Sequence, residues 1–227
     1  MKFSKTALLL SFVLALVISS CSIFNPDIQV EKRVALFFEV DEIADTLQAG
    51  QDTLRVDEFK FSIGQFNLAG NDIELGSSNS IRSFIFGFDK NATQERLVIS
   101  VGLSIADNAT FNRYTMFLRP VAEGSNVIDD DFRSSNGNYS IIVKGVYNGK
   151  NFNFRTRTNF TKELFFEDVK VNDDDETIVI IKSVDLKDVF YDENDNLIDP
   201  TNSENSSQII ENIESSIALE AFASNLL

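Results

Sequence analysis

Two kinds of side chain in this sequence could do chemistry: a single cysteine, Cys21, and 35 carboxylates. The chain has no histidine, which is the commonest general base and the commonest ligand of transition metals. Catalytic arrangements that pair a serine or a cysteine with histidine are therefore excluded. A metal site would have to use oxygen ligands, and Ca²⁺ suits such a site because it takes roughly six to eight of them.

The acidic residues gather in three runs, at 129–131, 173–176 and 192–196. The third run places Asp192, Asn194 and Asn196 at i, i+2 and i+4, the spacing that opens an EF-hand calcium loop. The sixth position is Leu197 instead of glycine and the twelfth is Ser203 instead of glutamate, which argues against a loop of that type. Two interpretations stay open for this run, a solvated turn or a weak Ca²⁺ site. We expect the other runs to be solvated loops, and we expect no other cofactor.

The N-terminal residues resemble the signal of a bacterial lipoprotein. Two lysines in the first five residues precede a mostly apolar run at 7–18, which is the layout of a secretion signal. This run is shorter than the roughly 20 residues that cross a bilayer. The motif Ile18-Ser19-Ser20-Cys21 then resembles a lipobox. The resemblance implies cleavage between Ser20 and Cys21, a diacylglyceryl group on the Cys21 sulfur and acylation of the new amine. The alternative is an ordinary secretion signal with a chance cysteine.

The residues after Cys21 bear on which membrane holds the protein. Ser22 stands where an aspartate typically retains lipoproteins at the inner membrane. The stretch 22–27, SIFNPD, lacks the dense acidic run that some Bacteroidota lipoproteins use as a surface-export signal. The sequence therefore predicts a lipid-anchored protein of the cell envelope, on the periplasmic leaflet of the outer membrane rather than at the cell surface.

The charge of the mature chain excludes one class of partner. Removing residues 1–20 takes two lysines and no acid from a chain with 20 basic and 35 acidic residues, so the remainder has a formal charge of −17. A body of that charge repels nucleic-acid phosphates and anionic lipid head groups. We therefore expect no nucleic-acid partner, and contact with a membrane only through the anchor at Cys21.

Alternation of apolar and polar residues predicts a β-rich body. Residues 84–88, 97–105 and 114–118 alternate with a period of two, whereas 34–40 and 176–184 are more continuously apolar, as expected of central strands. With Cys21 acylated, no thiol remains for a disulfide, so the core, rich in phenylalanine, must hold the fold. Eight or nine short strands separated by turns predict an antiparallel β-sandwich.

Three local features of this body are specific. The apolar positions of 59–68 change from odd to even numbers at Gly64, which predicts a β-bulge there. Asn148-Gly149 between two strand-like runs predicts a type I′ hairpin. A second hairpin is expected around 172–175, joining Lys170-Val171 to Thr177-Ile178.

The C-terminal tail has a different period. Ile210, Ile213, Ile217 and Ala221 lie at helical spacing, and Asn205 is placed to cap a helix. We expect an amphipathic helix of about 18–20 residues that packs on the body, with docking to a partner protein as the alternative. The predicted organisation is a signal peptide (1–20), an acylated cysteine and short tether (21–29), a β-sandwich domain (30–200) and the C-terminal helix (201–227).

Enzymatic activity is not expected. A pair of carboxylates could still hydrolyse a glycosidic bond, because that reaction needs only two side chains of this type. With 35 acidic residues the sequence cannot nominate a pair, and the chain has no tryptophan, the usual platform for a sugar ring. We therefore assign no catalytic residues and no cofactor-binding residues.

Aromatic side chains are the remaining lead to a binding surface. Phe152 and Phe154 alternate with polar residues, and Phe165 and Phe166 are adjacent. Neighbouring residues of a strand face opposite sides, so at least one of the adjacent pair is expected to be exposed or covered by the helix. Core or helix-covered positions are one interpretation of these rings, and a patch for a partner or ligand is the other.

Two segments resemble uncharacterised β-sandwich lipoproteins of Bacteroidota, including the methanobactin-associated MbnP-like group. They are VDEFKFSIGQFNLAG at 56–70 and DPTNSENSSQIIENIESSI at 199–217. The resemblance implies the fold and the envelope address. The copper chemistry linked to that group uses histidine and tryptophan, which this chain lacks, so metal binding is not implied here.

The expected function is a non-enzymatic binding or structural accessory of an envelope complex, with an envelope protein as its partner. A carbohydrate or cell-surface binding module, with or without Ca²⁺, is the alternative. A hydrolase with paired carboxylates is the third hypothesis.

Overall fold

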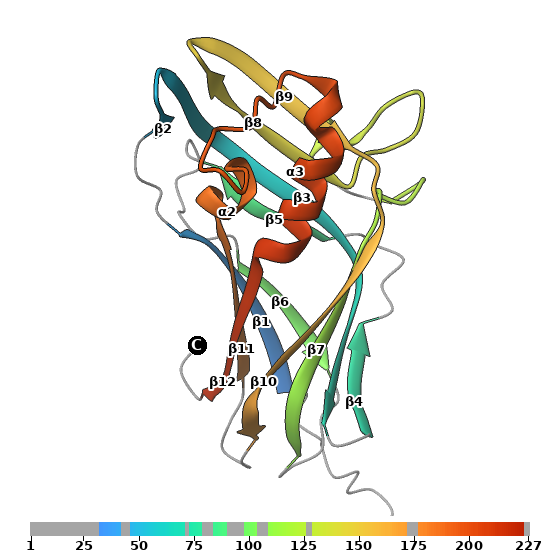
Figure 1. The fold of residues 1–227 in the computed structure, drawn as a ribbon. Helices are drawn as coiled ribbons and strands as arrows, with labels where there is room; N and C mark the ends of the chain where they lie inside the picture. The colour runs from blue at the N-terminus through green and yellow to red at the C-terminus, as the bar shows by residue number, and fades with distance from the viewer. Residues whose placement is uncertain are drawn as a thin grey trace, which may run out of the picture. The chain divides into compact units, whose positions relative to one another are not determined.

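The computed structural model describes residues 32–41, 46–70, 73–78, 84–89, 98–103, 109–125, 129–171 and 177–224. These residues are mainly β, with twelve strands and a short C-terminal helix (Figure 1). The strands belong to two sheets, and all but one of the pairings between them are antiparallel within the described ranges. Twelve exceeds the expected eight or nine because several short strands pair with one long strand.

The smaller sheet has the order β12-β11-β1-β6. Its central strands, β11 and β1, are the two continuously apolar runs, so the prediction that these runs are central is confirmed. They pair in parallel, and the outer strands pair with them in antiparallel fashion. The strands span Ile217–Ser224 (β12), Thr177–Asp185 (β11), Lys32–Asp41 (β1) and Val98–Leu103 (β6).

The larger sheet is built around β3, a strand of 19 residues from Asp52 to Gly70. The main order is β10-β7-β3-β8-β9, and β2, β4 and β5 also pair with β3. The neighbours span Phe160–Lys170 (β10), Thr110–Leu118 (β7), Ile141–Tyr147 (β8), Lys150–Thr156 (β9), Leu47–Ala49 (β2), Ile73–Ser78 (β4) and Phe84–Asp89 (β5).

A β-bulge at Gly64 divides β3 into two halves, as predicted. Ile63 pairs with Leu118 of β7, and Gln65 pairs with the next residue, Phe117, so Gly64 is the extra residue. The N-terminal half lies between β8 and β5, and the C-terminal half lies between β7 and β4 (Figure 1). The bulge therefore keeps the apolar residues of both halves in one core while the strand changes neighbours.

The two predicted hairpins have different outcomes. Asn148 and Gly149 have φ of 48° and 75°, as a type I′ turn requires, and they join β8 to β9. The hairpin expected around 172–175 is wrong. Lys170 pairs with Thr110 of the larger sheet and Thr177 pairs with strands of the smaller sheet, so this connection passes between sheets. β10 pairs with β7, and β11 pairs with β1 and β12, so a short polar link alone does not fix pairing.

One buried cluster supplies most of the core. Its largest members are aromatic, and phenylalanines of β3 and β7 are fully buried in it. Val184 of β11 and Ile217 of β12 belong to the same cluster, together with residues of the two α-helices. The helices are α2, Leu186–Phe190, and α3, Ser206–Ser216.

The C-terminal helix is shorter than predicted. It has 11 residues, preceded by a 3₁₀ turn, η2, at Ser203–Asn205, and Ile217–Ser224 continues as β12. The residues after Ser216 pair with β11 over eight positions, and this pairing overrides the helical spacing of the apolar ones. Asn205 makes no capping hydrogen bond; instead, the side chain of Asn202 accepts from the backbone N of Glu204 and caps η2.

A segment between β7 and β8 covers part of the outer face of the larger sheet, the face opposite the main core. We call residues 119–125 and 129–140 the covering segment; it contains a 3₁₀ turn, η1, at Asp130–Phe132. Its Val121 and Phe132 pack with Ile142 of β8 in a second buried cluster. Two backbone hydrogen bonds join it to Ser62 of β3. The backbone N of Ser62 donates to Ser140 O at 2.8 Å, and the backbone N of Arg119 donates to Ser62 O at 3.2 Å.

Candidate functional site

Cys21, predicted to carry the lipid anchor, and the predicted cleavage site between Ser20 and Cys21 lie outside the described residues, as does the acidic run at 173–176. In the part of the chain that the structure describes, no helix is both long and apolar enough to cross a membrane. The anchor therefore stays a prediction from the sequence.

The predicted calcium residues form a tight turn after α2. The Oδ1 atom of Asp192 accepts hydrogen bonds from the backbone N of Asn194 at 2.9 Å and of Asn196 at 2.8 Å. The amide of Asn196 donates to the other oxygen at 3.1 Å. These hydrogen bonds, led by those from Asn196, lower the pKa of Asp192. The structure thus brings the three side chains together, and the Asp192 carboxylate stabilises the turn through these hydrogen bonds.

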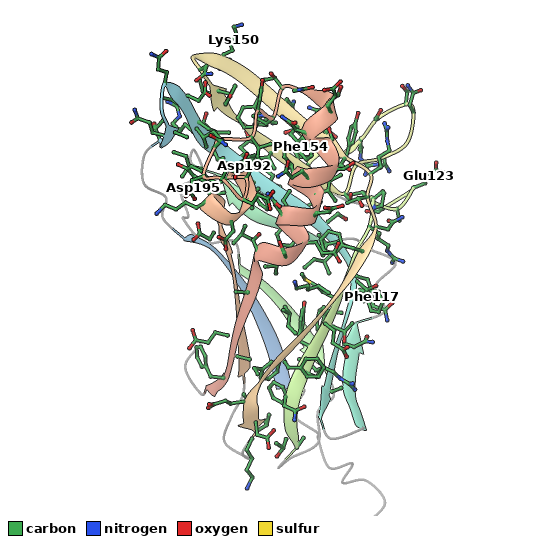
Figure 2. The ribbon with its side chains drawn as sticks, in the orientation of Figure 1. Phe117, Glu123, Lys150, Phe154, Asp192 and Asp195 are labelled. Atoms are coloured by element: carbon green, nitrogen blue, oxygen red, sulfur yellow. The ribbon has the colours of Figure 1, made fainter. Side chains whose placement is uncertain are left out.

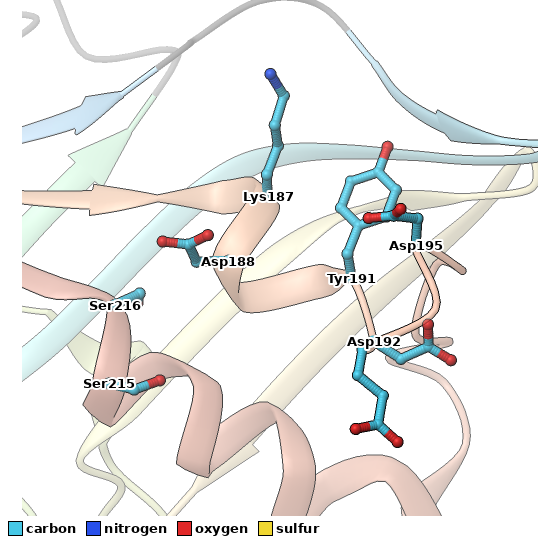
Figure 3. A pocket seen from close by; sticks show the side chains of 8 residues that line it. Lys187, Asp188, Tyr191, Asp192, Asp195, Ser215 and Ser216 are labelled. Atoms are coloured by element: carbon cyan, nitrogen blue, oxygen red, sulfur yellow. The ribbon is translucent and has the colours of Figure 1, made fainter.

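An open pocket of about 520 Å³ lies beside this turn (Figure 3). Four acidic side chains line it, with Lys187 and Tyr191 from α2 and its end, and Ser215 and Ser216 from α3. Among the described residues, no three or more cysteine, aspartate or glutamate side chains are placed to hold one metal ion. The weak Ca²⁺ site stays a prediction, with Asp192 already engaged by the turn.

The first acidic run has a role that the sequence analysis did not find. Asp129 and Asp131 meet two lysines on the outer face of the N-terminal half of β3 and on β8. The Nζ atom of Lys60 lies 3.0 Å from Asp129 Oδ2 and 2.8 Å from Glu58 Oε2. Lys144 Nζ lies 3.1 Å from Glu58 Oε2 and also contacts Asp131. We call these five residues the ionic cluster.

The centre of the ionic cluster is largely shielded from water. The side chain of Lys60 is 11% exposed and that of Glu58 is 17% exposed. Burial alone would lower the pKa of Lys60, but its contacts with Glu58 and Asp129 outweigh burial and raise the pKa. The hydrogen bond from Lys144 lowers the pKa of Asp131. Each carboxylate of the cluster is thus paired with a lysine, which suits a structural clamp on the covering segment better than proton transfer.

Only the pairing of distant residues reveals this cluster. Lys60 alternates with Phe59 and Phe61 on β3, and that pattern alone marks it as a solvated face.

Two of the predicted aromatic candidates belong to the core. Phe152 and Phe154 are each only 6% exposed. Phe166 is partly buried, with its ring edge-on to Phe111 at a centroid distance of 5.7 Å. Its neighbour Phe165 is 70% exposed, which confirms that one of the adjacent pair is exposed.

A second open pocket, of about 490 Å³, lies beside the bulge at Gly64. Gln65, Phe117 and Thr161 occupy paired positions on three neighbouring strands, so their side chains share the outer face. The guanidinium of Arg119 lies across Gly64 and donates to its carbonyl oxygen at 3.2 Å. Phe117 lies well away from Asp192 and Asp195 (Figure 2), so this pocket is separate from the acidic one.

Comparison with known proteins gives no relative from which a function could be transferred. No family model, curated protein or solved structure matches the chain.

Proposed function

We propose that this protein is a lipid-anchored component of the bacterial cell envelope, fastened through acylated Cys21, and that its body is a non-enzymatic binding or structural accessory. The observation that carries the proposal is the position of the only cysteine, directly after the leader motif Ile18-Ser19-Ser20. Lipoprotein acylation needs a thiol at that place, and several acyl chains bind a bilayer far more tightly than one. The outer membrane is the proposed site, on its periplasmic leaflet.

The chemistry of the body favours a binding or structural role over hydrolysis. The carboxylates of the ionic cluster are paired with lysines and hold the covering segment in place. A carboxylate-pair hydrolase needs one acid kept protonated and one carboxylate beside the bond that breaks. In the ionic cluster, the hydrogen bond from Lys144 lowers the pKa of Asp131 and so opposes its protonated form.

We also propose that the two sheets pack as a β-sandwich. Support comes from the shared core, in which Val184 and Ile217 of the smaller sheet lie in one buried cluster with Phe66 and Met116 of the larger sheet. In addition, Lys162 of β10 donates to the backbone oxygen of Glu214, close to the start of β12.

Cell fractionation tests the anchor. The wild-type protein should be recovered with membranes and should take up labelled palmitate. The Cys21→Ala variant should lose the label and move to the soluble fraction, while Cys21→Ser controls for the loss of the sulfur alone. Equal membrane recovery of wild type and Cys21→Ala, without palmitate uptake by the wild type, would refute the proposal. Proteins that co-purify with the acylated form, identified by mass spectrometry, would name the partner.

A further inference from the structure

The pocket beside the bulge differs in charge from the rest of this acidic protein. Its lining residues are Gln65, Phe117, Leu118, Arg119, Asn159, Phe160 and Thr161. One guanidinium is the only charged group of that lining, and no carboxylate belongs to it. The nearest row of the sheet places Glu163 across from Thr115, but Glu163 is neutralised by Arg113 at 3.4 Å. The pocket is therefore a locally cationic place on a chain of net charge −15.

The groups around Phe117 can bind a polar ring. Phe117 lies between an amide, Gln65, and a hydroxyl, Thr161, in one row across three strands. Gln65 donates one amide proton to Asn67 Oδ1 at 3.2 Å, which orients its side chain. Amide and hydroxyl groups both donate and accept hydrogen bonds, as a polyol does. An aromatic face packs against the C–H groups of a sugar ring, so the row combines the two contacts that sugars need.

Arg119 favours a ligand that carries a negative charge. Its guanidinium is held in place by the carbonyl oxygen of Gly64, and this bond uses one of several N–H donors. The remaining donors form a planar fork that suits a carboxylate. We propose that this pocket binds an acidic sugar, with the ring against Phe117 and the carboxylate on Arg119.

The outer face extends the site along β10. Thr161, Glu163 and Phe165 alternate on the exposed side of that strand. Phe165 lies four residues beyond Thr161, roughly 13 Å along the strand. That length matches a short oligosaccharide rather than a single sugar. This inference rests on the proposed role as a binding protein and is independent of the anchor.

Titration calorimetry on the full-length protein in detergent tests the site. The probe is a trisaccharide of galacturonic acid, and the neutral trisaccharide of galactose is its matched control. We expect the acidic probe to bind about tenfold more tightly than the neutral one, which corresponds to about 1.4 kcal/mol. Added salt should reduce this difference, because an exposed ion pair is screened.

Three variants assign the contacts. Phe117→Ala should abolish binding of both probes, and Arg119→Gln should remove only the preference for the acidic one. Phe165→Ala should weaken the trisaccharide but not the galacturonic acid monomer. Glu193→Gln, in the acidic pocket, is the control and should bind like wild type. Thermal unfolding of each variant shows whether it has kept its fold.

Several results would overturn the inference. Absence of heat with either probe at millimolar concentration would refute the site itself. Equal affinity for both probes, or an unchanged preference in a folded Arg119→Gln variant, would refute the role of Arg119. Binding that survives Phe117→Ala would place the ligand elsewhere. None of these results affects membrane recovery of the Cys21 variants, so the inference and the proposed function fail separately.

Discussion

The two halves of β3 present polar side chains on the same outer face, yet the surroundings of those side chains differ. Before Gly64, Glu58 and Lys60 lie beneath the covering segment and are bound into the ionic cluster. After Gly64, Gln65 and Asn67 are partly exposed, and Gln65 lines an open pocket. The difference shows that alternation decides which side chains leave the core, whereas tertiary cover decides which of them reach water.

The largest expected effect is at the centre of the covered half. Lys60→Ala should lower the free energy of unfolding by about 3 kcal/mol, because it takes from Asp129 the cation that binds it and leaves the shielded Glu58 with Lys144 alone. Chemical denaturation at neutral pH measures this loss. Lys60→Arg, which keeps the charge, is the control and should cost much less. A loss of unfolding free energy smaller than that expected for an exposed ion pair would show that the cluster does not hold the covering segment.

Acid should weaken the covered half. The pKa of Asp131 is lowered in the folded protein, so its stabilisation is present above the unfolded pKa of about 4 and is lost as the pH falls through the folded pKa. The pKa values of Lys60 and Lys144 are raised, so their contribution lasts until alkaline pH. Stability should thus be flat near neutrality and fall in acid. Asp131→Asn should reduce the loss of unfolding free energy between neutral and acid pH. An unchanged dependence on pH in this variant would contradict the role given to Asp131.

The boundary between the halves depends on Gly64. A Cβ atom there would lie 1.8 Å from Arg119 Nε, so Gly64→Ala must displace that side chain. We expect a loss of about 1 kcal/mol in the free energy of unfolding, which is modest because the obstacle is a flexible side chain. The double variant Gly64→Ala with Arg119→Ala should be no less stable than Arg119→Ala alone. Additive losses would show that the clash is not the cause.

The smallest effect is expected in the open half. Arg113 and Glu163 form an ion pair there with side chains 35% and 44% exposed. Arg113→Ala should change the free energy of unfolding by less than about 0.5 kcal/mol, because exposed pairs contribute little. Its loss in the free energy of unfolding should be much smaller than that of Lys60→Ala. Similar losses from both variants would show that the two halves of β3 do not differ in this way.

Local signals predicted the elements that depend on local chemistry. The bulge at Gly64 followed from a change of apolar phase, and the turn at Asn148-Gly149 from residues that accept positive φ. The central strands β1 and β11 followed from continuous apolar runs. Each of these features is set by neighbours in the sequence, so the sequence alone carries it.

Long-range pairing explains what the sequence analysis missed. Residues after Ser216 have helical spacing, but in the folded protein they pair with β11. Even the pair that is closest in sequence, Val184 with Ile217, is 33 residues apart. The ionic cluster joins Lys60 to Asp129, which are 69 residues apart. No local pattern encodes such distances, and the pocket at Gly64 has the same origin in three strands that meet only on folding.

The parallel pairing of β1 with β11 also bears on when the chain can fold. Arg33 lies opposite Thr177, 144 residues further along, and β12 adds its edge to β11 only after that. A nascent polypeptide that emerges from its N-terminus therefore cannot complete the smaller sheet until nearly all of it has been delivered. Contacts of such long range form slowly. If the chain is exported in extended form, as the proposed anchor requires, late closure of this kind would keep the smaller sheet open during passage.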